Sequence, residues 1–294
     1  MKKTRIPGWI DVIKVDRPDE IDEMTRNPQI DRRFTSLSPV INGLLLGHVL
    51  AALCFRGQRF PTMSPRECPA RARKQELLWV SLNREAPSLK LGPDQLENLA
   101  VWLRGTGNEL ELGMLVQQIV GRSFSDTYTA TSESWSAALA LDAAPRKNNP
   151  FTLLVWWLTG RVRKAKTLLA SKVNGDLAGI HGTGVALHNI VKSFQHMSSL
   201  YSNLSLRSSL SPEEVSRQCL FAPASILRQA TGAGDLAGCP FRKGTLFVAA
   251  LSEARKKSGS EEVVFLRNSW SRCPAEQWVP ALLEGVWRRA TEHL

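Results

Sequence analysis

The sequence has few cysteines, and the positions that they occupy are far apart. Five occur in 294 residues, none of them in a C-x-x-C pair. An odd and dispersed set predicts neither a disulfide framework nor a zinc site. Free cysteines are typical of a reducing compartment, so we expect a cytoplasmic protein. The hydrophobic content of 43% excludes disorder of the whole chain.

Long apolar runs are also missing. The basic start at Met1–Arg5 is followed by Ile6-Pro7-Gly8-Trp9, which breaks the apolar core that a signal peptide needs. The longest apolar run, Ile41–Phe55, is interrupted by Asn42 and His48 and is too short to cross a bilayer. We interpret this run as a buried helix, with peripheral membrane contact as the alternative.

Several catalytic motifs are absent. The sequence has no H-E-x-x-H zinc motif and no G-x-S-x-G nucleophile turn, which removes the main support for a metallopeptidase or a serine hydrolase. The net charge of +11 is large. However, the basic residues are scattered in short runs such as Arg71–Lys74, without interleaved aromatics, which argues against nucleic-acid binding and indicates a solvated basic surface.

The first half of the chain has helical periodicity with little β pattern. Trp9–Val15 alternates as an edge strand does, and a helix should open at Pro18. The expected helices that follow are 94–103, 110–120, 132–142, the apolar 151–158 and the basic amphipathic 163–171. Residues 144–150 form a short linker between helical layers. The fold class is therefore mainly α with a small β region, in one domain.

A long central helix is expected over residues 174–201. Apolar residues recur there at three- and four-residue spacing, although Gly179, Gly182 and Gly184 interrupt them. Each glycine weakens a helix by roughly 1 kcal/mol relative to alanine, which suggests that something approaches the backbone closely. The alternative is a close crossing of two helices.

The last third of the chain, 211–294, carries an ordered series of features. Ser211-Pro212 begins a helix that places Glu214 and Arg217 on one face. Arg228 follows, and then a strand, turn and strand are expected over Leu236–Val248. Cys273-Pro274 leads into an amphipathic helix over 275–288.

This order resembles the cytochrome P450 family of haem-thiolate proteins. The residues that match are the Glu-x-x-Arg pair of Glu214 and Arg217, the propionate-binding Arg228, the glycine and Lys-Gly positions Gly238 and Lys243-Gly244, and the ligand Cys273. The segment between Gly244 and Cys273 is short, and the family's glycine turn before the ligand is absent. The chain therefore resembles a shortened and divergent member, with a cytochrome P450-like fold.

The resemblance implies a site for haem b between the central helix and the Cys273 turn. Cys273 is then the iron ligand, Arg228 and Arg272 face the propionates, and Thr183 with His181 lines the distal side. The Glu214–Arg217 pair braces the proximal side. The expected domain is one haem-binding unit over 1–294, with a helical layer at 1–143, the linker near 144–150, the central helix at 174–201 and the proximal region at 211–294.

The implied activity is oxygen transfer to an apolar small-molecule substrate, as a monooxygenase or a peroxygenase. The basic surface would suit an acidic electron-donor protein. The turn Arg272-Cys273-Pro274 resembles that of the peroxide-using branch. The alternative is a non-catalytic haem-binding sensor or partner protein, which is supported by three Cys-Pro dipeptides and by the absence of an intact acid–alcohol pair near Thr183.

Overall fold

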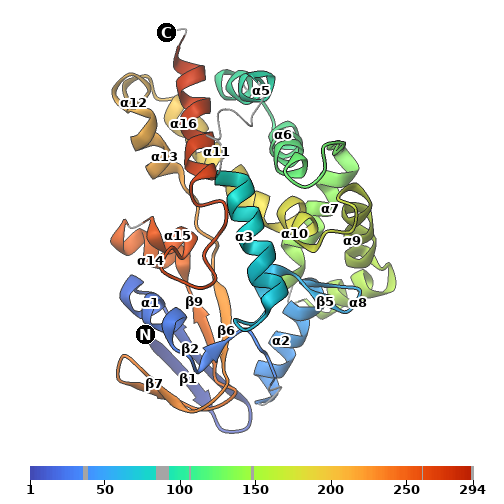
Figure 1. Cartoon of the computed structure of the whole chain (residues 1–294), viewed down its shortest axis with the longest axis vertical. Coiled ribbons are helices and arrows are strands. Elements are labelled where there is room, and N and C mark those ends of the chain that lie inside the picture. Colours follow the sequence, from blue (N-terminus) through green and yellow to red (C-terminus); the bar gives the residue numbers. More distant parts are fainter. Residues whose placement is uncertain (36–38, 84–92, 106, 147–148, 260, 293–294) are drawn as a thin grey trace. The chain divides into compact units, whose positions relative to one another are not determined.

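The structure is a computed structural model that describes residues 1–35, 39–83, 93–105, 107–146, 149–259 and 261–292. Two compact units form the chain. The first contains residues 1–76 and 222–276, and the second contains residues 77–221 and 277–294. Each unit is therefore built from two stretches that are far apart in the sequence (Figure 1).

The first unit is built on a five-stranded sheet in the order β1-β2-β9-β6-β3. Its strands are β1 Lys2–Ile6, β2 Ile10–Val15, β3 Ile30–Asp31, β6 Ile226–Ala230 and β9 Leu246–Ala249. Strand β2 pairs antiparallel with β1 and parallel with β9, while β6 pairs antiparallel with β9. The sheet thus joins the two ends of the sequence.

Two hairpins and several helices complete the first unit. The hairpins are β4 Cys54–Phe55 with β5 Gln58–Arg59, and β7 Gly234–Leu236 with β8 Cys239–Phe241. The turn of the second hairpin has Ala237 and Gly238 at φ 46° and 78°, the left-handed pair that suits a two-residue hairpin. The helical elements are α1 Pro18–Arg26, α2 Val40–Ala52, the turn η1 Pro61–Met63, α14 Leu251–Ser258 and α15 Glu262–Phe265. Helix α3, Pro69–Asn83, runs across the boundary between the units.

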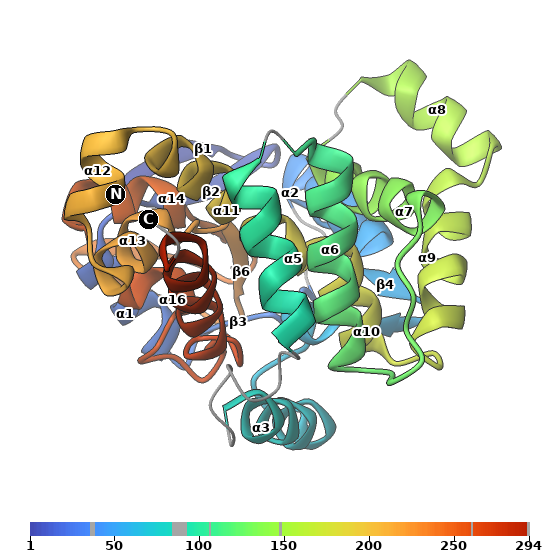
Figure 2. The same cartoon turned by 90° about the horizontal axis from the view of Figure 1, so that it is seen from above.

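The second unit is helical throughout the part that the structure describes. Its helices are α5 Pro93–Arg104, α6 Glu109–Arg122, α7 Ser132–Ala143 with the turn η2 Ala144–Arg146, α8 Pro150–Leu158, α9 Arg161–Lys172, α10 Leu177–His181, η3 Gly182–Ala186, α11 Leu187–Tyr201, α12 Leu204–Ser209, α13 Pro212–Cys219 and α16 Trp278–Thr291. Figure 2 shows α5, α6 and α7 in sequence, with α9 beside α7. The mainly helical fold class with a small β region is confirmed.

The core of the second unit lies where its last helix meets earlier ones. Trp287 on α16 is 1% exposed, and its ring meets that of Tyr201 on α11 edge to face, with centroids 5.7 Å apart. The Tyr201 hydroxyl donates to the carbonyl of Ala290 at 3.2 Å. Ser216 on α13 donates to the carbonyl of Pro280 at 3.2 Å. The C-terminal helix therefore closes this core.

The central helix forms, but it is not a regular α-helix. Asp176 caps it, because its carboxylate accepts from the backbone N–H groups of Ala178 and Gly179. The glycine-rich stretch Gly182–Ala186 is a π-helical segment between α10 and α11. Such a segment inserts an extra residue and alters the hydrogen-bond ladder. Within this segment, the carbonyl of Thr183 accepts from the buried side chain of Gln117 at 2.9 Å.

Two local predictions were wrong. The expected edge strand lies inside the sheet as β2, because β1 covers its outer side. The strand, turn and strand expected over Leu236–Val248 are confirmed as β8, the turn at 242–245 and β9, although β8 pairs with β7 and β9 pairs with β2 and β6. Helix α2 buries Asn42 and Leu46 only on one face, and Leu44 is 69% exposed on the other. Periodicity located these elements but not their neighbours.

Candidate functional site

Cys273 lies in a tight loop of the first unit, after α15. Helix α15 ends at Phe265, and the left-handed φ of 53° at the next residue, Leu266, turns the chain back. The backbone N–H of Cys273 donates to the carbonyl of Phe265 at 2.8 Å. The backbone N–H of Arg272 donates to the carbonyl of Ser269 at 3.0 Å. These bonds hold the cysteine backbone in a fixed turn. The sequence predicted a turn at Cys273 followed by a helix over 275–288; the helix α16 begins at Trp278.

The thiol of Cys273 is in a desolvated position. The pKa of this thiol is raised to about 11, mainly by burial; a hydrogen bond from the backbone N–H of Ala275 lowers the pKa, and the carboxylate of Glu276 raises it. The free protein therefore holds a neutral thiol that already has one backbone donor directed at the sulfur. A positive charge brought to this sulfur would favour its thiolate form.

Arg228 connects strand β6 to the cysteine loop. Its side chain is 2% exposed, and its Nη2 donates to Ser271 Oγ at 2.8 Å. Ser271 also lies 2.9 Å from the hydroxyl of Ser269, so the loop and the strand share one buried polar network. Through this bond Arg228 contacts the cysteine loop at Ser271, two residues before Cys273.

Four arginines surround the ring of Trp270, three residues before Cys273. The distances from guanidinium carbon to ring centroid are 4.8 Å for Arg32 and for Arg71, 5.4 Å for Arg66 and 5.5 Å for Arg228. Arg32 directly follows β3, Arg66 lies between η1 and α3, Arg71 is in the first turn of α3 and Arg228 is in β6. We call these four arginines with Trp270 the arginine cluster. Guanidinium groups within 6 Å of an indole are attracted to its face.

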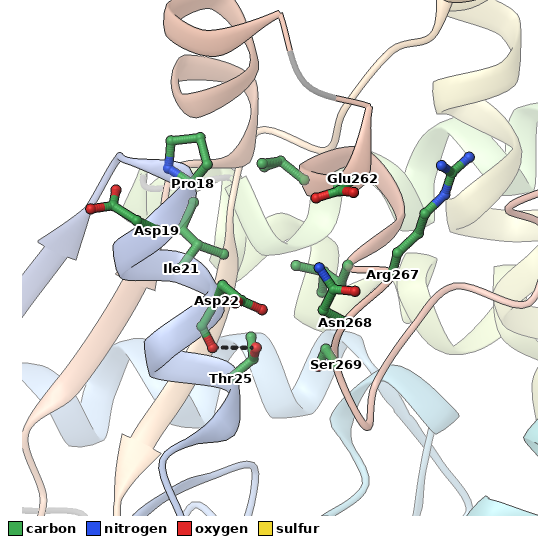
Figure 3. A pocket seen from close by; sticks show the side chains of 11 residues that line it. Pro18, Asp19, Ile21, Asp22, Thr25, Glu262, Arg267, Asn268 and Ser269 are labelled. Atoms are coloured by element: carbon green, nitrogen blue, oxygen red, sulfur yellow. Dashed lines mark hydrogen bonds between the residues drawn. The ribbon is translucent and has the colours of Figure 1, made fainter.

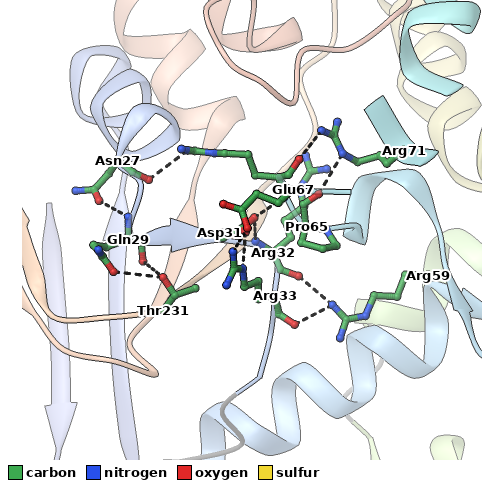
Figure 4. Close-up of polar contacts among 11 residues, drawn as sticks. Asn27, Gln29, Asp31, Arg32, Arg33, Arg59, Pro65, Glu67, Arg71 and Thr231 are labelled. Carbon is green, nitrogen blue, oxygen red and sulfur yellow. Dashed lines mark hydrogen bonds and ion pairs between the residues drawn. The ribbon is translucent and has the colours of Figure 1, made fainter. Parts of the chain in front are cut away.

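The charge of the arginine cluster is only partly balanced. Asp31 accepts from the backbone N–H of Arg32 at 2.6 Å and of Arg66 at 2.8 Å, and it also forms an ion pair with Arg33 at 3.3 Å (Figure 4). Burial lowers the pKa of Arg228 to about 9, although Asp31 raises it, and burial lowers the pKa of Arg32 well below its usual range. Keeping the guanidinium groups of Arg228 and Arg32 charged therefore costs free energy.

The cluster also has donors without acceptors. Among the residues that the structure describes, no acceptor meets the buried Nε of Arg32, Arg66 or Arg228, nor the indole N–H of Trp270. A buried donor without a partner costs about 1–3 kcal/mol. Excess positive charge and unpaired donors in one place are what a buried anion would satisfy.

Arg272, the second residue expected at a propionate, has a different environment. Its side chain is 37% exposed and lies 4.0 Å from Glu76. Its carbonyl accepts from Gln75 Nε2 at 2.6 Å, and the carbonyl of Trp270 accepts from Arg71 at 3.5 Å. The N-terminal half of α3 thus supports the cysteine loop through two bonds to its backbone.

Thr183 and His181 lie on the central helix, in the second unit. Thr183 is fully buried, and its hydroxyl donates to the carbonyl of Gly179 at 2.7 Å. His181 is half-buried at the end of α10. The helix histidine that packs most closely against an aromatic is His188, whose ring lies 5.1 Å from that of Trp135 and whose pKa is lowered by burial.

Protein side chains fill the space beside the helix glycines. A β-carbon on Gly182 would lie 2.8 Å from the Phe124 ring, and one on Gly184 would lie 2.8 Å from Leu141 and from Leu169. The close approach that the glycines predicted is therefore made by the turn after α6 at Gly182 and by helices α7 and α9 at Gly184. This observation supports the alternative of a close helix crossing.

Glu214 and Arg217, which were expected to brace the proximal side, lie at the surface of the second unit. Both side chains are exposed. Glu214 completes a capping box instead: Ser211 Oγ accepts from the backbone N–H of Glu214 at 3.2 Å, and the Glu214 carboxylate accepts from that of Ser211 at 2.8 Å. The backbone N–H of Ser211 lowers the pKa of Glu214. Glu214 therefore takes part in the cap that begins this helix, and the bracing role of the pair stays a prediction.

A separate hollow of 170 Å³ opens in the first unit between α1 and the segment that follows α14 (Figure 3). Its polar lining includes Asp19, Asp22, Glu262 and Arg267. Sites for drug-sized ligands measure about 300–1,000 Å³, so this hollow is too small for such a substrate. No group of three or more His, Cys, Asp or Glu side chains in the described part of the chain is placed to hold a metal ion.

The sequence predicted Cys273 and Arg228 as site residues but did not indicate the other members of the arginine cluster. Arg32, Arg66, Arg71 and Trp270 are dispersed over 240 residues and follow no periodicity. Their convergence depends on the pairing of β3 with β6 and on the path of the segment 56–71. The one signal available was the unusual density of arginine and proline in that segment.

Comparison with known proteins gives a consistent result. No protein-family model matches the sequence, and no curated protein matches it. Solved structures do match. They include the cytochrome P450 RauA, complexed with a biosynthetic intermediate of aurachin RE, with a TM-score of 0.64 at 13% identity over 95% of this chain and 83% of that one.

Two further structures agree with RauA. CYP154C4 from Streptomyces sp. ATCC 11861 has a TM-score of 0.64 at 12% identity over 98% of this chain and 83% of its own. Ligand-free cytochrome P450 OleT has a TM-score of 0.61 at 10% identity over 97% of this chain and 82% of its own. The chain therefore has the cytochrome P450 fold in a shortened form.

Proposed function

We propose that this chain, whose fold is that of the cytochromes P450, is a haem-thiolate oxidoreductase that transfers oxygen to an apolar organic substrate. The observation that carries the proposal is the arginine cluster beside the Cys273 loop. A dianionic, largely apolar ligand such as haem would supply the acceptors that the buried guanidinium groups lack. The same ligand would bring an iron ion for the desolvated sulfur of Cys273.

The residues present fit a haem b group. Arg228 and Arg32 are buried, each has an Nε without an acceptor among the described residues, and both would donate to the two propionates; Arg272 is the further candidate on the same loop. Cys273 would be the iron ligand, with the N–H of Ala275 directed at its sulfur. A thiolate-ligated haem supplies oxygen-transfer chemistry when it is bound.

The chain's own residues would have distinct tasks in this proposal. The arginines would fix the orientation of the cofactor through paired, charge-assisted hydrogen bonds. The loop bonds of Cys273 and Arg272 would hold the ligand sulfur in place while the reaction proceeds. On the central helix, His181 would carry a proton on the substrate side, and Thr183 would contribute its hydroxyl once released from the carbonyl of Gly179.

One observation favours a second candidate, a haem-binding protein without turnover. Thr183 donates its hydroxyl to the backbone, and side chains fill the space beside Gly182 and Gly184. Both features reduce the means for relaying protons on the substrate side. The same proximal residues would bind haem in this candidate, so spectroscopy tests haem ligation and turnover separates the two.

The absorption spectrum of the reduced protein under carbon monoxide tests the haem-thiolate proposal. We expect the red-shifted Soret band that thiolate ligation gives, and we expect Cys273→Ala to abolish it. Cys68→Ala and Cys239→Ala are matched controls, since both remove a half-buried cysteine that precedes a proline. If all three substitutions weaken haem binding equally, Cys273 is not the ligand.

A further inference from the structure

Helix α8, Pro150–Leu158, presents an apolar surface to solvent. Phe151 is 79% exposed, Trp157 77%, Leu158 67%, Val155 54% and Leu154 53%. Phe151, Leu154, Val155 and Leu158 follow the spacing i, i+3, i+4, i+7 and so form one stripe along the helix. Such a stripe normally faces a core, but here it faces outward. Figure 2 shows α8 extending away from α7.

The sequence around α8 has only one sign of charge. From residue 143 to residue 175 there is no Asp or Glu, while Arg146, Lys147, Arg161, Arg163, Lys164, Lys166 and Lys172 are basic. Helix α8 itself carries no charged residue. Helix α9 follows it directly, after Gly160 in the left-handed conformation, and places Arg161, Arg163 and Lys164 on its exposed side.

The two helices are linked by an aromatic contact. The guanidinium of Arg161 lies 4.8 Å from the ring of the half-buried Trp156. The helix also begins at a capped, defined position, because Asn149 accepts from the backbone N–H of Thr152 at 3.2 Å. The apolar stripe and the basic start of α9 are thus held next to each other within one unit.

We infer that α8 and the start of α9 bind an anionic lipid surface, with α8 lying in the plane of the membrane interface. Interfacial helices combine Trp, Phe and Leu on one face with Lys and Arg nearby, and they insert about 5–10 Å below the headgroups. At about 1.5 Å per residue, the nine residues of α8 are far shorter than the hydrocarbon thickness, so α8 can lie on a bilayer but cannot cross it. No helix in the described residues could cross one.

The alternative occupant is a second copy of this chain. Charge decides between the two. A symmetric contact through α8 would bring the basic starts of two α9 helices toward each other, which is unfavourable because like charges repel. Anionic headgroups would instead pair with the basic residues at the start of α9, at a gain of about fivefold in affinity per Lys or Arg near the surface. The proposal does not depend on haem.

Flotation of the purified protein with lipid vesicles tests the proposal. We expect binding to vesicles that contain 30% phosphatidylglycerol, and much weaker binding to pure phosphatidylcholine vesicles, with the difference falling as salt is raised. The double variant Leu154→Glu/Trp157→Glu should lower the partition coefficient at least tenfold, since each side chain withdrawn from the bilayer is worth about tenfold or more. Arg163→Glu/Lys164→Glu should lower it about twentyfold or more on anionic vesicles only.

Leu204→Glu is the matched control. Leu204 is 69% exposed on α12, in the same unit, but has no such basic neighbour helix. We expect its binding to equal that of the unchanged protein, and we expect all variants to keep the same thermal midpoint, since every substituted residue is exposed. Equal binding to both vesicle types would overturn the proposal. So would a lack of vesicle binding combined with a dimer in solution that Leu154→Glu/Trp157→Glu dissociates, which would assign α8 to a second copy.

Discussion

At the scale of single residues, Arg228 shows a conflict between stability and the proposed function. It is buried, and its Nε finds no acceptor among the described residues. The positive charges of Arg66 and Arg71 add to the desolvation that lowers its pKa to about 9. Groups kept at such a cost in a free protein are common at binding sites, where a ligand supplies the missing partner.

Replacing Arg228 should therefore have opposite effects on the free and the haem-loaded protein. We expect Arg228→Met to raise the free energy of unfolding of the haem-free protein by about 1–2 kcal/mol, because an apolar side chain removes an unbalanced buried charge. The same substitution should weaken haem retention at least tenfold. Chemical denaturation and haem transfer to apomyoglobin measure the two quantities.

The control for this experiment is Arg56→Met. Arg56 is exposed and lies over the ring of Phe55 at 5.2 Å, away from the arginine cluster. We expect neither stability nor haem retention to change by more than about 0.5 kcal/mol. A haem-free Arg228→Met protein that is less stable than the original would contradict the view that the charge is unbalanced.

These residues also show the limit of prediction from sequence at this scale. Cys273 and Arg228 could be predicted as site residues because the order of motifs in the last third of the chain indicates their places. Arg32, Arg66, Arg71 and Trp270 could not, since an arginine is compatible with a solvated surface wherever no partner is known. Only the tertiary path shows that these four residues meet.

At the scale of elements, the start of α13 is set by a reciprocal cap and not by a buried ion pair. Ser211→Ala removes the side chain that accepts from the N–H of Glu214, and we expect a loss of about 1 kcal/mol. Glu214→Ala should cost less than Ser211→Ala, and the protein should fold and keep its haem. Thermal unfolding shows which of the two substitutions destabilises the protein more.

Glu213→Ala is the matched control for Glu214→Ala. It lies on the same turn but outside the capping box, and its partner Arg288 is 3.8 Å away at the surface. We expect no measurable change. Misfolded or haem-free Glu214→Ala protein, beside a normal Glu213→Ala protein, would restore the hypothesis that the Glu-x-x-Arg pair is a structural brace.

The π-helical segment of the central helix makes a second prediction at this scale. Gly184→Ala should destabilise the protein by about 1–3 kcal/mol, because its β-carbon would lie 2.8 Å from Leu141 and from Leu169. Gly285→Ala on α16 is the control in the same unit: its β-carbon would meet Leu96 at an ordinary 3.5 Å. There the usual preference of helices for alanine should give a gain of about 0.5–1 kcal/mol.

Opposite signs for the two substitutions would show that helix packing, rather than backbone preference, explains the glycines. A gain from both would mean that the neighbours of Gly184 can move aside, and that the space beside the central helix is available to a ligand. The sequence predicted a close approach to these glycines but could not identify the approaching group, since glycine leaves the same pattern beside a ligand and beside another helix.

At the scale of the whole molecule, the sequence predicted the fold class from helical periodicity and the family resemblance from the order of the motifs. The order of the capped helix, the arginine, the Lys-Gly turn and the cysteine survives in a chain that is only 10–13% identical to the three P450 structures compared. The pairing of the strands in the sheet could not be predicted from the sequence. The five-stranded sheet joins residues 2–31 to residues 226–249, and no local pattern specifies contacts at that separation.

The oxidant is the property that depends on the whole molecule. Use of dioxygen would require electrons from a partner protein and protons relayed on the substrate side, whereas peroxide brings its own electrons and needs a single base. The central helix offers His181 as that base, and the Thr183 hydroxyl is bonded to the backbone. We therefore expect faster turnover with hydrogen peroxide than with dioxygen and a reductase.

A panel of apolar substrates assayed under both conditions measures this difference. We expect His181→Ala to lower peroxide-driven turnover by about 10²-fold or more, the usual contribution of a general base, while the carbon monoxide spectrum stays unchanged. His196→Ala, on the far part of the same helix, is the control and should leave turnover unchanged. Product formed only in the reductase-driven reactions would contradict the peroxide assignment and would mean that a proton relay forms once Thr183 leaves the carbonyl of Gly179. Haem-loaded protein that gives product under neither condition would favour the non-catalytic candidate, because the proximal residues bind haem in both.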